Sequence, residues 1–369
     1  MTTASTMYAL SLDQIAAAML AGGNKRTTLV QGDMGTGKSS LLKMLAEKLP
    51  NHKPCYFDCT TKDLGDITIP DLVSGTPDDE KSKGYVTYLT NEELGVHNNV
   101  PIILMVDEYG KALPPVKNAL LRLMLERKMG SYTLHPDSIV FATTNLGAEG
   151  VGDMMMPHQR NRITVVTSRK PTADEWIEWG INNDVDHTLL GWAKDTPQLF
   201  QSFTDISAPD DNPYIFHPQA PERDAFVTPR SLEAASDWMK VRHDFDDHTL
   251  TSLLIGTIGA RGAMDLGAFV KLADTMPTRA EIQDSPHDAR VPDSAAGVCM
   301  VVFRTLSSMT KEYLNPWMDY LDRLPLEAQG MFANGVRADK YKDRGMVMGN
   351  KKFTEWAMKN NYLFSAEKK

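Results

Sequence analysis

Gly32-Asp33-Met34-Gly35-Thr36-Gly37-Lys38-Ser39 is the stretch of this chain that decides its fold. It follows the apolar run Thr28-Leu29-Val30 and leads into residues 41–45, where leucine and methionine recur on one face of a predicted helix. The order is strand, glycine-rich loop and helix, with the pattern G-x-x-x-x-G-K-[ST] at the junction. A flexible glycine turn would need neither the lysine nor the serine. The stretch is therefore predicted to be a nucleotide-binding phosphate loop.

The chemistry of phosphate binding explains each residue type in this loop. Glycines let backbone N–H groups curl around a phosphate without a side-chain clash, and the helix N-terminus adds unpaired donors. Lys38 is predicted to reach the β- and γ-phosphates of ATP, and the Ser39 hydroxyl to bind Mg²⁺. The predicted nucleotide-binding residues of the loop are Gly32, Asp33, Met34, Gly35, Thr36, Gly37, Lys38, Ser39 and Ser40.

A second apolar run, residues 101–106, ends in two carboxylates, Asp107 and Glu108. Such a run is typical of a strand buried on both faces of a parallel sheet. Ligands of open α/β sheets bind at the carboxyl edge, where these acids would lie. Asp107 is predicted to hold Mg²⁺ with Ser39, and Glu108 to orient or deprotonate the attacking water. The alternative is a solvated strand end, which the upstream phosphate loop makes the weaker interpretation.

A third apolar run, residues 139–144, ends in Asn145. An amide at the same sheet edge could position the attacking water against the γ-phosphate. The alternative is a turn-forming Asn ahead of Gly147. A further strand is predicted at residues 163–167, and beyond Pro171 the strand pattern gives way to helical segments.

Composition narrows the classes of protein that this chain can represent. The 369 residues include 48 acidic and 39 basic side chains, a net charge of −9, which makes nucleic acid an unlikely partner. Three cysteines, an odd number in a long chain, argue against a disulfide framework and favour a reducing compartment. The N-terminus lacks a signal-peptide pattern, and no apolar run approaches the ~20 residues that span a bilayer. We therefore expect a cytoplasmic protein without membrane segments.

The pattern of segments predicts an α/β fold, with buried strands and the phosphate loop in the first part of the chain and helical segments beyond Pro171. The predicted domains are a nucleotide-binding core over residues 1–170, a lid over 171–255 and an extension over 256–369. The core contains an insertion at about 59–100, which includes the short alternating piece Tyr85–Leu89.

The motifs together resemble the AAA+ ATPase superfamily and, within it, the MoxR-type clade. Residues 32–39 match Walker A, Asp107-Glu108 matches Walker B, and Asn145 matches sensor 1. Asn161-Arg162-Ile163 stands where the family carries its arginine finger, with isoleucine in place of the aromatic, and Arg160 is the competing choice. Arg230 in Thr-Pro-Arg-Ser-Leu matches sensor 2 and would contact the nucleotide.

The resemblance implies a P-loop αβα core with a five-stranded parallel sheet, followed by an α-helical lid and a helical C-terminal extension. It implies an extra hairpin in the insertion, of which Tyr85–Leu89 would be a part. It implies a Mg²⁺-dependent ATPase that assembles into a homo-oligomeric ring, usually a hexamer, and acts as a remodelling chaperone or activase. It also implies a partner protein with a von Willebrand factor A-like domain, and an insertion hairpin that engages partners. The aromatic-hydrophobic-glycine pore loop of protein-threading unfoldases is not found. Two alternatives stay open at this point, a nucleic-acid motor or loader and a ring in which ATP binding only sets assembly. The acidic balance opposes the first, and Glu108 opposes the second.

Overall fold

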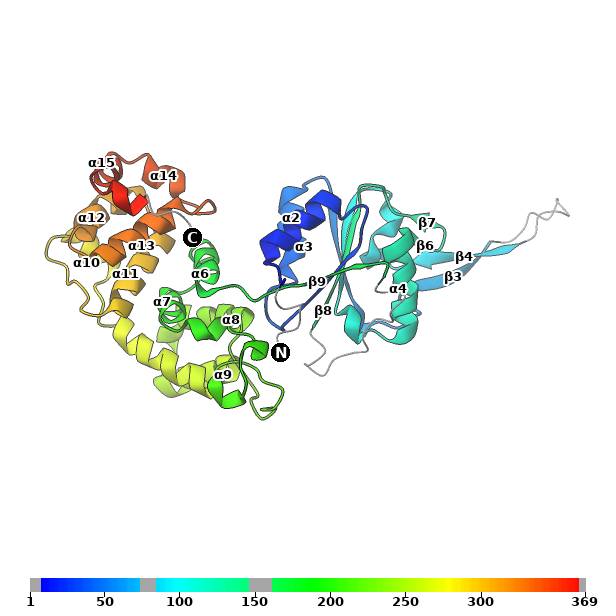
Figure 1. The fold of residues 1–369 in the computed structure, drawn as a ribbon, viewed down its shortest axis with the longest axis horizontal. Coiled ribbons are helices and arrows are strands. Elements are labelled where there is room, and N and C mark those ends of the chain that lie inside the picture. The colour runs from blue at the N-terminus through cyan, green and yellow to red at the C-terminus, as the bar shows by residue number, and fades with distance from the viewer. Residues whose placement is uncertain (1–7, 74–83, 146–160, 365–369) are drawn as a thin grey trace. The chain divides into compact units, whose positions relative to one another are not determined.

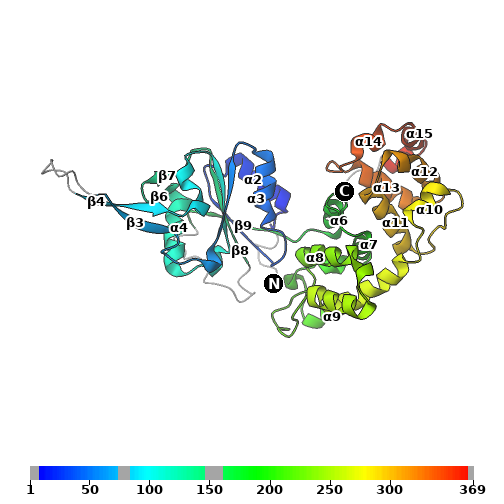
Figure 2. The same ribbon diagram turned by 180° about the vertical axis from the view of Figure 1, so that it is seen from behind.

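The structure is a computed structural model that describes residues 8–73, 84–145 and 161–364. The chain divides into two compact units, one ending at Lys170 and the other beginning at Pro171. The first contains the sheet and the second is helical (Figures 1 and 2). Each unit is described by itself.

The first unit is built on a parallel sheet of five strands in the order β2-β5-β8-β1-β9. The predicted P-loop αβα core is therefore confirmed. Its strands are β1 (Thr28–Gly32), β2 (Lys53–Asp58), β5 (Ile102–Asp107), β8 (Ile139–Asn145) and β9 (Thr164–Thr167).

Alternate residues of the central strands bury on opposite faces of the sheet. On one face, Ile103 and Phe141 pack with helices α2 (Leu12–Gly22) and α3 (Ser40–Lys48). On the other face, Leu104 and its neighbours pack with α4 (Pro114–Glu126). Figure 1 shows these helices on either side of the sheet. Burial on both faces explains why the strands read as unbroken apolar runs.

The insertion in the first unit forms an antiparallel hairpin of β3 (Thr68–Val73) and β4 (Tyr85–Thr90), which confirms the hairpin prediction. It projects from the core in Figure 1. A second, shorter ladder joins β6 (Lys128–Met129) to β7 (Tyr132–Thr133). The Thr87 and Ser131 hydroxyls, 3.5 Å apart, connect the two ladders.

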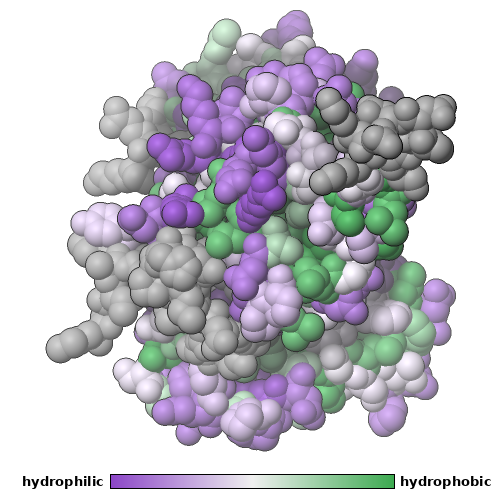
Figure 3. All heavy atoms as spheres, turned by 90° about the vertical axis from the view of Figure 1, so that its right-hand side faces the viewer, coloured by the Kyte–Doolittle hydropathy of each residue, from purple (hydrophilic) through white to green (hydrophobic). Residues whose placement is uncertain are grey.

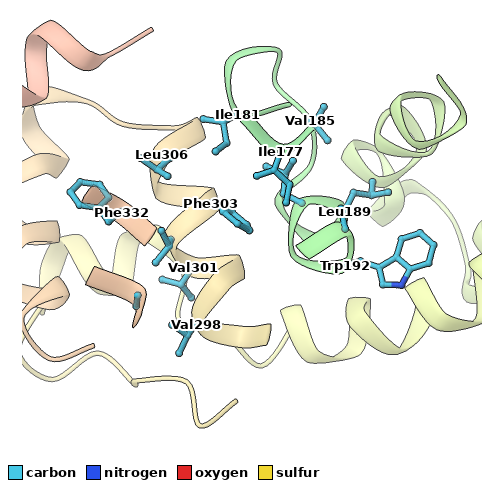
Figure 4. Packing of buried hydrophobic residues seen from close by; sticks show 14 of the residues in the cluster. Ile177, Ile181, Val185, Leu189, Trp192, Val298, Val301, Phe303, Leu306 and Phe332 are labelled. Carbon is cyan, nitrogen blue, oxygen red and sulfur yellow. The ribbon is translucent and has the colours of Figure 1, made fainter. Parts of the chain in front are cut away.

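The second unit has one continuous hydrophobic cluster that reaches from Trp176 to Trp356. Figure 4 shows part of this cluster, in which Ile177 and Phe303, from helices far apart in the sequence, lie side by side. The helices are α6 (Ala173–Asn182), α7 (His187–Asp195), α8 (Pro229–Lys240), α9 (Asp247–Ala273), α10 (Arg279–Asp284), α11 (Ala295–Ser307), α12 (Lys311–Leu321), α13 (Leu326–Arg337), α14 (Arg344–Met348) and α15 (Lys351–Lys359). The predicted boundary between lid and extension, 255/256, falls inside α9, and the functional division of this unit stays a prediction.

Helix α9 is the one helix in the described ranges that is long and apolar enough, by length and composition, to cross a membrane. This differs from the expectation that no segment reaches that length, because small residues such as glycine and alanine fill the gaps between its apolar side chains. Its backbone leaves the helical conformation at Gly259, with φ 78° and ψ 160°. Leu254, Ile258 and Leu266 of α9 join the hydrophobic cluster of the unit. Such a helix is weak evidence of a membrane span.

Candidate active site

Parallel pairing brings the ends of three central strands to one edge of the sheet. Gly32 at the end of β1 is in register with Asn145 at the end of β8. Val106 of β5 is in register with Ala142 of β8, so Asp107 and Glu108 emerge beside Thr143 and Asn145. The three motifs found along the chain therefore lie together, as the sequence predicts.

The phosphate loop has the backbone that its glycines allow. Gly35 and Gly37 have φ angles of 69° and 87°, a region that L side chains rarely adopt. The Thr36 hydroxyl donates to the Asp33 carbonyl at 3.0 Å, and the Ser40 hydroxyl donates to the Gly37 carbonyl at 2.7 Å. These bonds close the loop around the start of α3.

One chain of hydrogen bonds connects the loop lysine to the acid that follows β5. Lys38 Nζ donates to the Gly32 and Asp33 carbonyls at 2.9 and 2.7 Å, and to Asn145 Oδ1 at 2.9 Å. Asn145 Nδ2 in turn donates to Glu108 Oε1 at 3.2 Å. The amide of Asn145 thus bridges the group predicted to bind phosphate and the group predicted to activate water.

The backbone of Glu108 has an unusual, left-handed conformation. Its φ of 51° and ψ of 37° are left-handed, which is uncommon for a residue other than glycine and concentrates at functional sites. The Glu108 N–H donates to Asp107 Oδ1 at 3.1 Å and to the Thr143 hydroxyl at 3.3 Å. Lys111, in the turn that follows, places Nζ 3.2 Å from Glu108 Oε1. Asn145 and Lys111 therefore both contact Oε1 of the Glu108 carboxylate.

Both oxygens of Asp107 have protein donors. Oδ1 accepts the Thr143 hydroxyl, and Oδ2 accepts the Tyr56 hydroxyl at 2.9 Å. Burial, followed by this hydrogen bond and the nearby carboxylates, raises the pKa of Tyr56 above its ordinary value. Tyr56 therefore keeps its proton, and remains a donor to Asp107, at neutral and moderately alkaline pH.

The residues at this edge fit a Mg²⁺ ion with the donor set predicted for them. Ser39 stands at the N-cap of α3, and its hydroxyl makes no capping bond to the described backbone of that helix, which leaves it available as a ligand. Asp107 offers a carboxylate whose orientation two hydroxyls fix. In the described ranges no three His, Cys, Asp or Glu side chains form a metal cluster. A hydroxyl, an aspartate and substrate phosphates are the usual ligands of a nucleotide-bound magnesium ion.

Tyr56→Phe should raise the Mg²⁺ concentration needed for half-maximal nucleotide binding by about fivefold, because one net hydrogen bond to Asp107 is worth about 1 kcal/mol. Thr143→Val should act in the same direction, since Thr143 is fully buried and bonds the other oxygen. The measurement is a Mg²⁺ titration of fluorescent ATP-analogue binding, with Tyr132→Phe as the matched control. An unchanged titration for both variants would show that Asp107 needs no such support.

The three arginines singled out in the sequence are not brought to this edge by the described contacts. Arg162 is exposed just before β9 and makes no ion pair among the described residues. Arg160 lies outside the described residues. Arg230 is exposed in the first turn of α8, which the Thr228–Ser231 capping box begins. It belongs to the second unit, so its contact with a nucleotide stays a prediction.

Sequence reasoning missed three side chains of this site: Tyr56, Lys111 and Thr143. Two had a usable signal. Thr143 precedes Asn145 by two residues and so shares its face of β8, and Lys111 follows Glu108 by one turn. Tyr56 had none, because only the pairing of β2 with β5 brings it beside Asp107.

No family model matches the chain, and no curated protein matches it. Solved structures with similarity include NtrX from Brucella abortus, with 15% identity, a TM-score of 0.37 and coverage of 98% of this chain and 69% of NtrX. The RuvB Holliday junction branch migration motor of Thermotoga maritima has 14% identity, a TM-score of 0.35 and coverage of 82% and 86%. A proposed ATPase from Cytophaga hutchinsonii has 17% identity and a TM-score of 0.35 over 48% of this chain and 52% of its own length. Similarities this low carry no functional argument, so function is argued from the site.

Proposed function

We propose that this protein is a Mg²⁺-dependent ATPase of the AAA+ superfamily, of the MoxR type, that works as a ring and remodels or activates a partner protein. The observation that carries the ATPase part is the hydrogen-bond chain Lys38–Asn145–Glu108 at the carboxyl edge of the sheet. A protein that only binds nucleotide needs the lysine but has no use for a carboxylate placed beside the sensor amide.

The proposed reaction is hydrolysis of the terminal phosphoanhydride bond of ATP. Glu108 takes a proton from a water molecule as the water oxygen bonds to the γ-phosphorus, and Asn145 fixes the direction of the carboxylate. The bond from the γ-phosphorus to the bridging oxygen breaks, and ADP and inorganic phosphate leave. Lys38 and the loop N–H groups stabilise the charge on the phosphates. Ser39 and Asp107 would hold Mg²⁺, which supplies further charge stabilisation when bound.

Ring assembly supports turnover in this proposal, because a neighbouring subunit would supply the arginine that meets the γ-phosphate. A guanidinium suits this charge in shape, and such a residue contributes ~10³–10⁵ in rate. Arg162 is an exposed cation without an ion-pair partner among the described residues, as a residue reserved for a neighbour would be. Arg160 stays the competing choice.

Arg162→Ala subunits should be inactive alone and should regain turnover when they are mixed with Lys38→Ala subunits. In a mixed ring, some interfaces combine the intact phosphate loop of one subunit with the intact Arg162 of its neighbour. The measurement is phosphate release after mixing, with exchange of subunits confirmed by mass. Persistent inactivity in confirmed mixed rings would oppose a role for Arg162 in trans. The same experiment with Arg160→Ala distinguishes the two arginines.

The insertion hairpin is the proposed contact with the partner protein. It exposes apolar side chains on both faces: Leu72 (78% exposed) with Val86 on one, and Tyr85 (63%) with Ile69 (59%) on the other. Figure 3 views the side on which the hairpin projects in Figure 1, with apolar side chains among polar ones. The described residues of the two strands include one acidic side chain, Asp71, and contain no lysine or arginine. Such a surface favours a protein partner over nucleic acid.

Leu72→Ser/Tyr85→Ser should leave basal ATP turnover within about twofold, because surface changes far from a site act nearly independently of it. The partner to test is a purified protein with a von Willebrand factor A-like domain, and the readout is stimulation of turnover. The hairpin variant should lose the stimulation, while Leu326→Ser, an exposed leucine of the second unit, should keep it. Equal stimulation of both variants would exclude the hairpin as the contact.

A further inference from the structure

The phosphate loop contains a buried carboxylate that the proposed function does not use. Asp33 is the second residue of the loop and is 6% exposed, and its Oδ2 has no hydrogen-bond partner among the described residues. Its backbone carbonyl accepts Lys38 Nζ, so the residue lies inside the phosphate-binding machinery. A negative charge at this place opposes the binding of phosphates unless another group neutralises it.

Lys170 is placed to neutralise this charge. Its Nζ lies 3.5 Å from Asp33 Oδ2, and the two side chains are each 8% exposed. An ion pair screened so little by solvent is strongly coupled, and removing one partner leaves an uncompensated buried charge. The two residues are distant in the sequence, and the second closes the first compact unit directly before Pro171.

The fold explains why the two residues meet. Strand β9 runs parallel to β1, and the Ser168 N–H continues the ladder by donating to the Gln31 carbonyl at 2.7 Å. Gly32 permits this approach, since a Cβ there would lie 2.1 Å from Ser168 Oγ. The chain leaving β9 therefore passes the start of the phosphate loop at close range.

We propose that Lys170 is a positioning residue of the nucleotide site, whose charge neutralises Asp33 so that the loop can accept phosphates. The inference rests on the proposed function in that the ligand is ATP. It adds a dependence of ATP affinity on a residue that lies outside every nucleotide-binding motif. Because Lys170 precedes Pro171, the phosphate loop is also tied to the segment from which the helical unit starts.

The test is a set of variants measured with a fluorescent ATP analogue and by thermal melting without nucleotide. Lys170→Met should weaken nucleotide affinity about tenfold or more and lower Tm, because Asp33 is left charged and unpaired. Asp33→Asn should bind at least as tightly as the wild type, and Asp33→Asn/Lys170→Met should recover most of the lost affinity and Tm. Lys170→Arg keeps the charge and should stay near the wild type.

Lys240→Met, which breaks a more exposed pair with Asp184 in the helical unit, is the control and should leave affinity unchanged. Wild-type affinity in Lys170→Met would overturn the inference. A double variant as weak as Lys170→Met would also overturn it, because the lysine would then act other than through Asp33. If Lys170→Met fails to fold, Asp33→Asn decides: a clear loss of affinity would show that the carboxylate is needed rather than tolerated. A wild-type protein that does not bind the analogue would instead contradict the proposed function.

Discussion

Glu108→Gln is expected to lower ATP turnover by about 10²-fold or more, since a positioned general base contributes 10²–10⁴ in rate. Glutamine keeps the size of the side chain and can still contact Asn145, but it cannot accept the proton of the attacking water. ATP binding should persist, because the proposed phosphate contacts are made by the loop and by Lys38. The variant should therefore hold ATP and, if the ring is stabilised by nucleotide, favour the assembled form.

The measurement for Glu108→Gln is steady-state phosphate release alongside ATP-analogue binding. Glu126→Gln, an exposed glutamate at the end of α4 paired with Arg122, is the matched control and should behave as the wild type. Normal turnover in Glu108→Gln would remove this residue from the mechanism. Loss of both binding and turnover would mean that the carboxylate supports the fold of the site, through Asn145 and Lys111, rather than the chemistry.

Lys38→Ala is expected to weaken ATP binding by about 2–5 kcal/mol, the usual cost of truncating one member of a buried charge pair. In the proposed site the Lys38 ammonium is the fixed positive charge that meets the phosphates, and it already lies against the Gly32 and Asp33 carbonyls of the loop. Lys38→Met keeps the aliphatic stem and separates loss of charge from loss of packing. Both variants should show the same weakening if charge is responsible.

The measurement for Lys38→Ala is titration with a fluorescent ATP analogue, and the control is Lys43→Ala, an exposed lysine of the same helix α3. Unchanged affinity in both Lys38 variants would contradict the assignment of residues 32–39 as the phosphate loop. Thermal melting of each variant should accompany the titration, because Lys38 also donates to the Gly32 and Asp33 carbonyls. Lower Tm with normal affinity would assign Lys38 a structural role alone.

The strands and the phosphate loop could be predicted because their signals are local. A strand buried on both faces reads as a continuous apolar run, and Gly35, Gly37 and Lys38 occur at fixed spacing before a helix. Asn145 lies beside Glu108 because β5 and β8 are parallel and both end at the same edge of the sheet. This placement could be predicted from the fold class alone, without knowledge of side-chain contacts.

The rest of the site depends on contacts between segments far apart in the sequence. Tyr56 reaches Asp107 only because β2 pairs with β5, and Lys170 reaches Asp33 only because β9 lies beside β1. The left-handed backbone of Glu108 also had no sequence signal, since glutamate does not favour that conformation. In the helical unit, the tertiary packing of α9 against its neighbours joins two predicted domains in one hydrophobic cluster, which periodicity could not show.

The most direct test of the account is the rate of phosphate release from ATP per subunit, measured with Mg²⁺ over a wide range of protein concentration. We expect Mg²⁺-dependent turnover per subunit that rises with protein concentration, because each proposed site needs an arginine from a neighbouring subunit. Glu108→Gln should lower this turnover by about 10²-fold or more. A rate per subunit that is independent of protein concentration would support ATP hydrolysis but contradict the proposal that a neighbouring subunit supplies an arginine. No phosphate release above the Glu108→Gln background at any concentration would contradict the central claim.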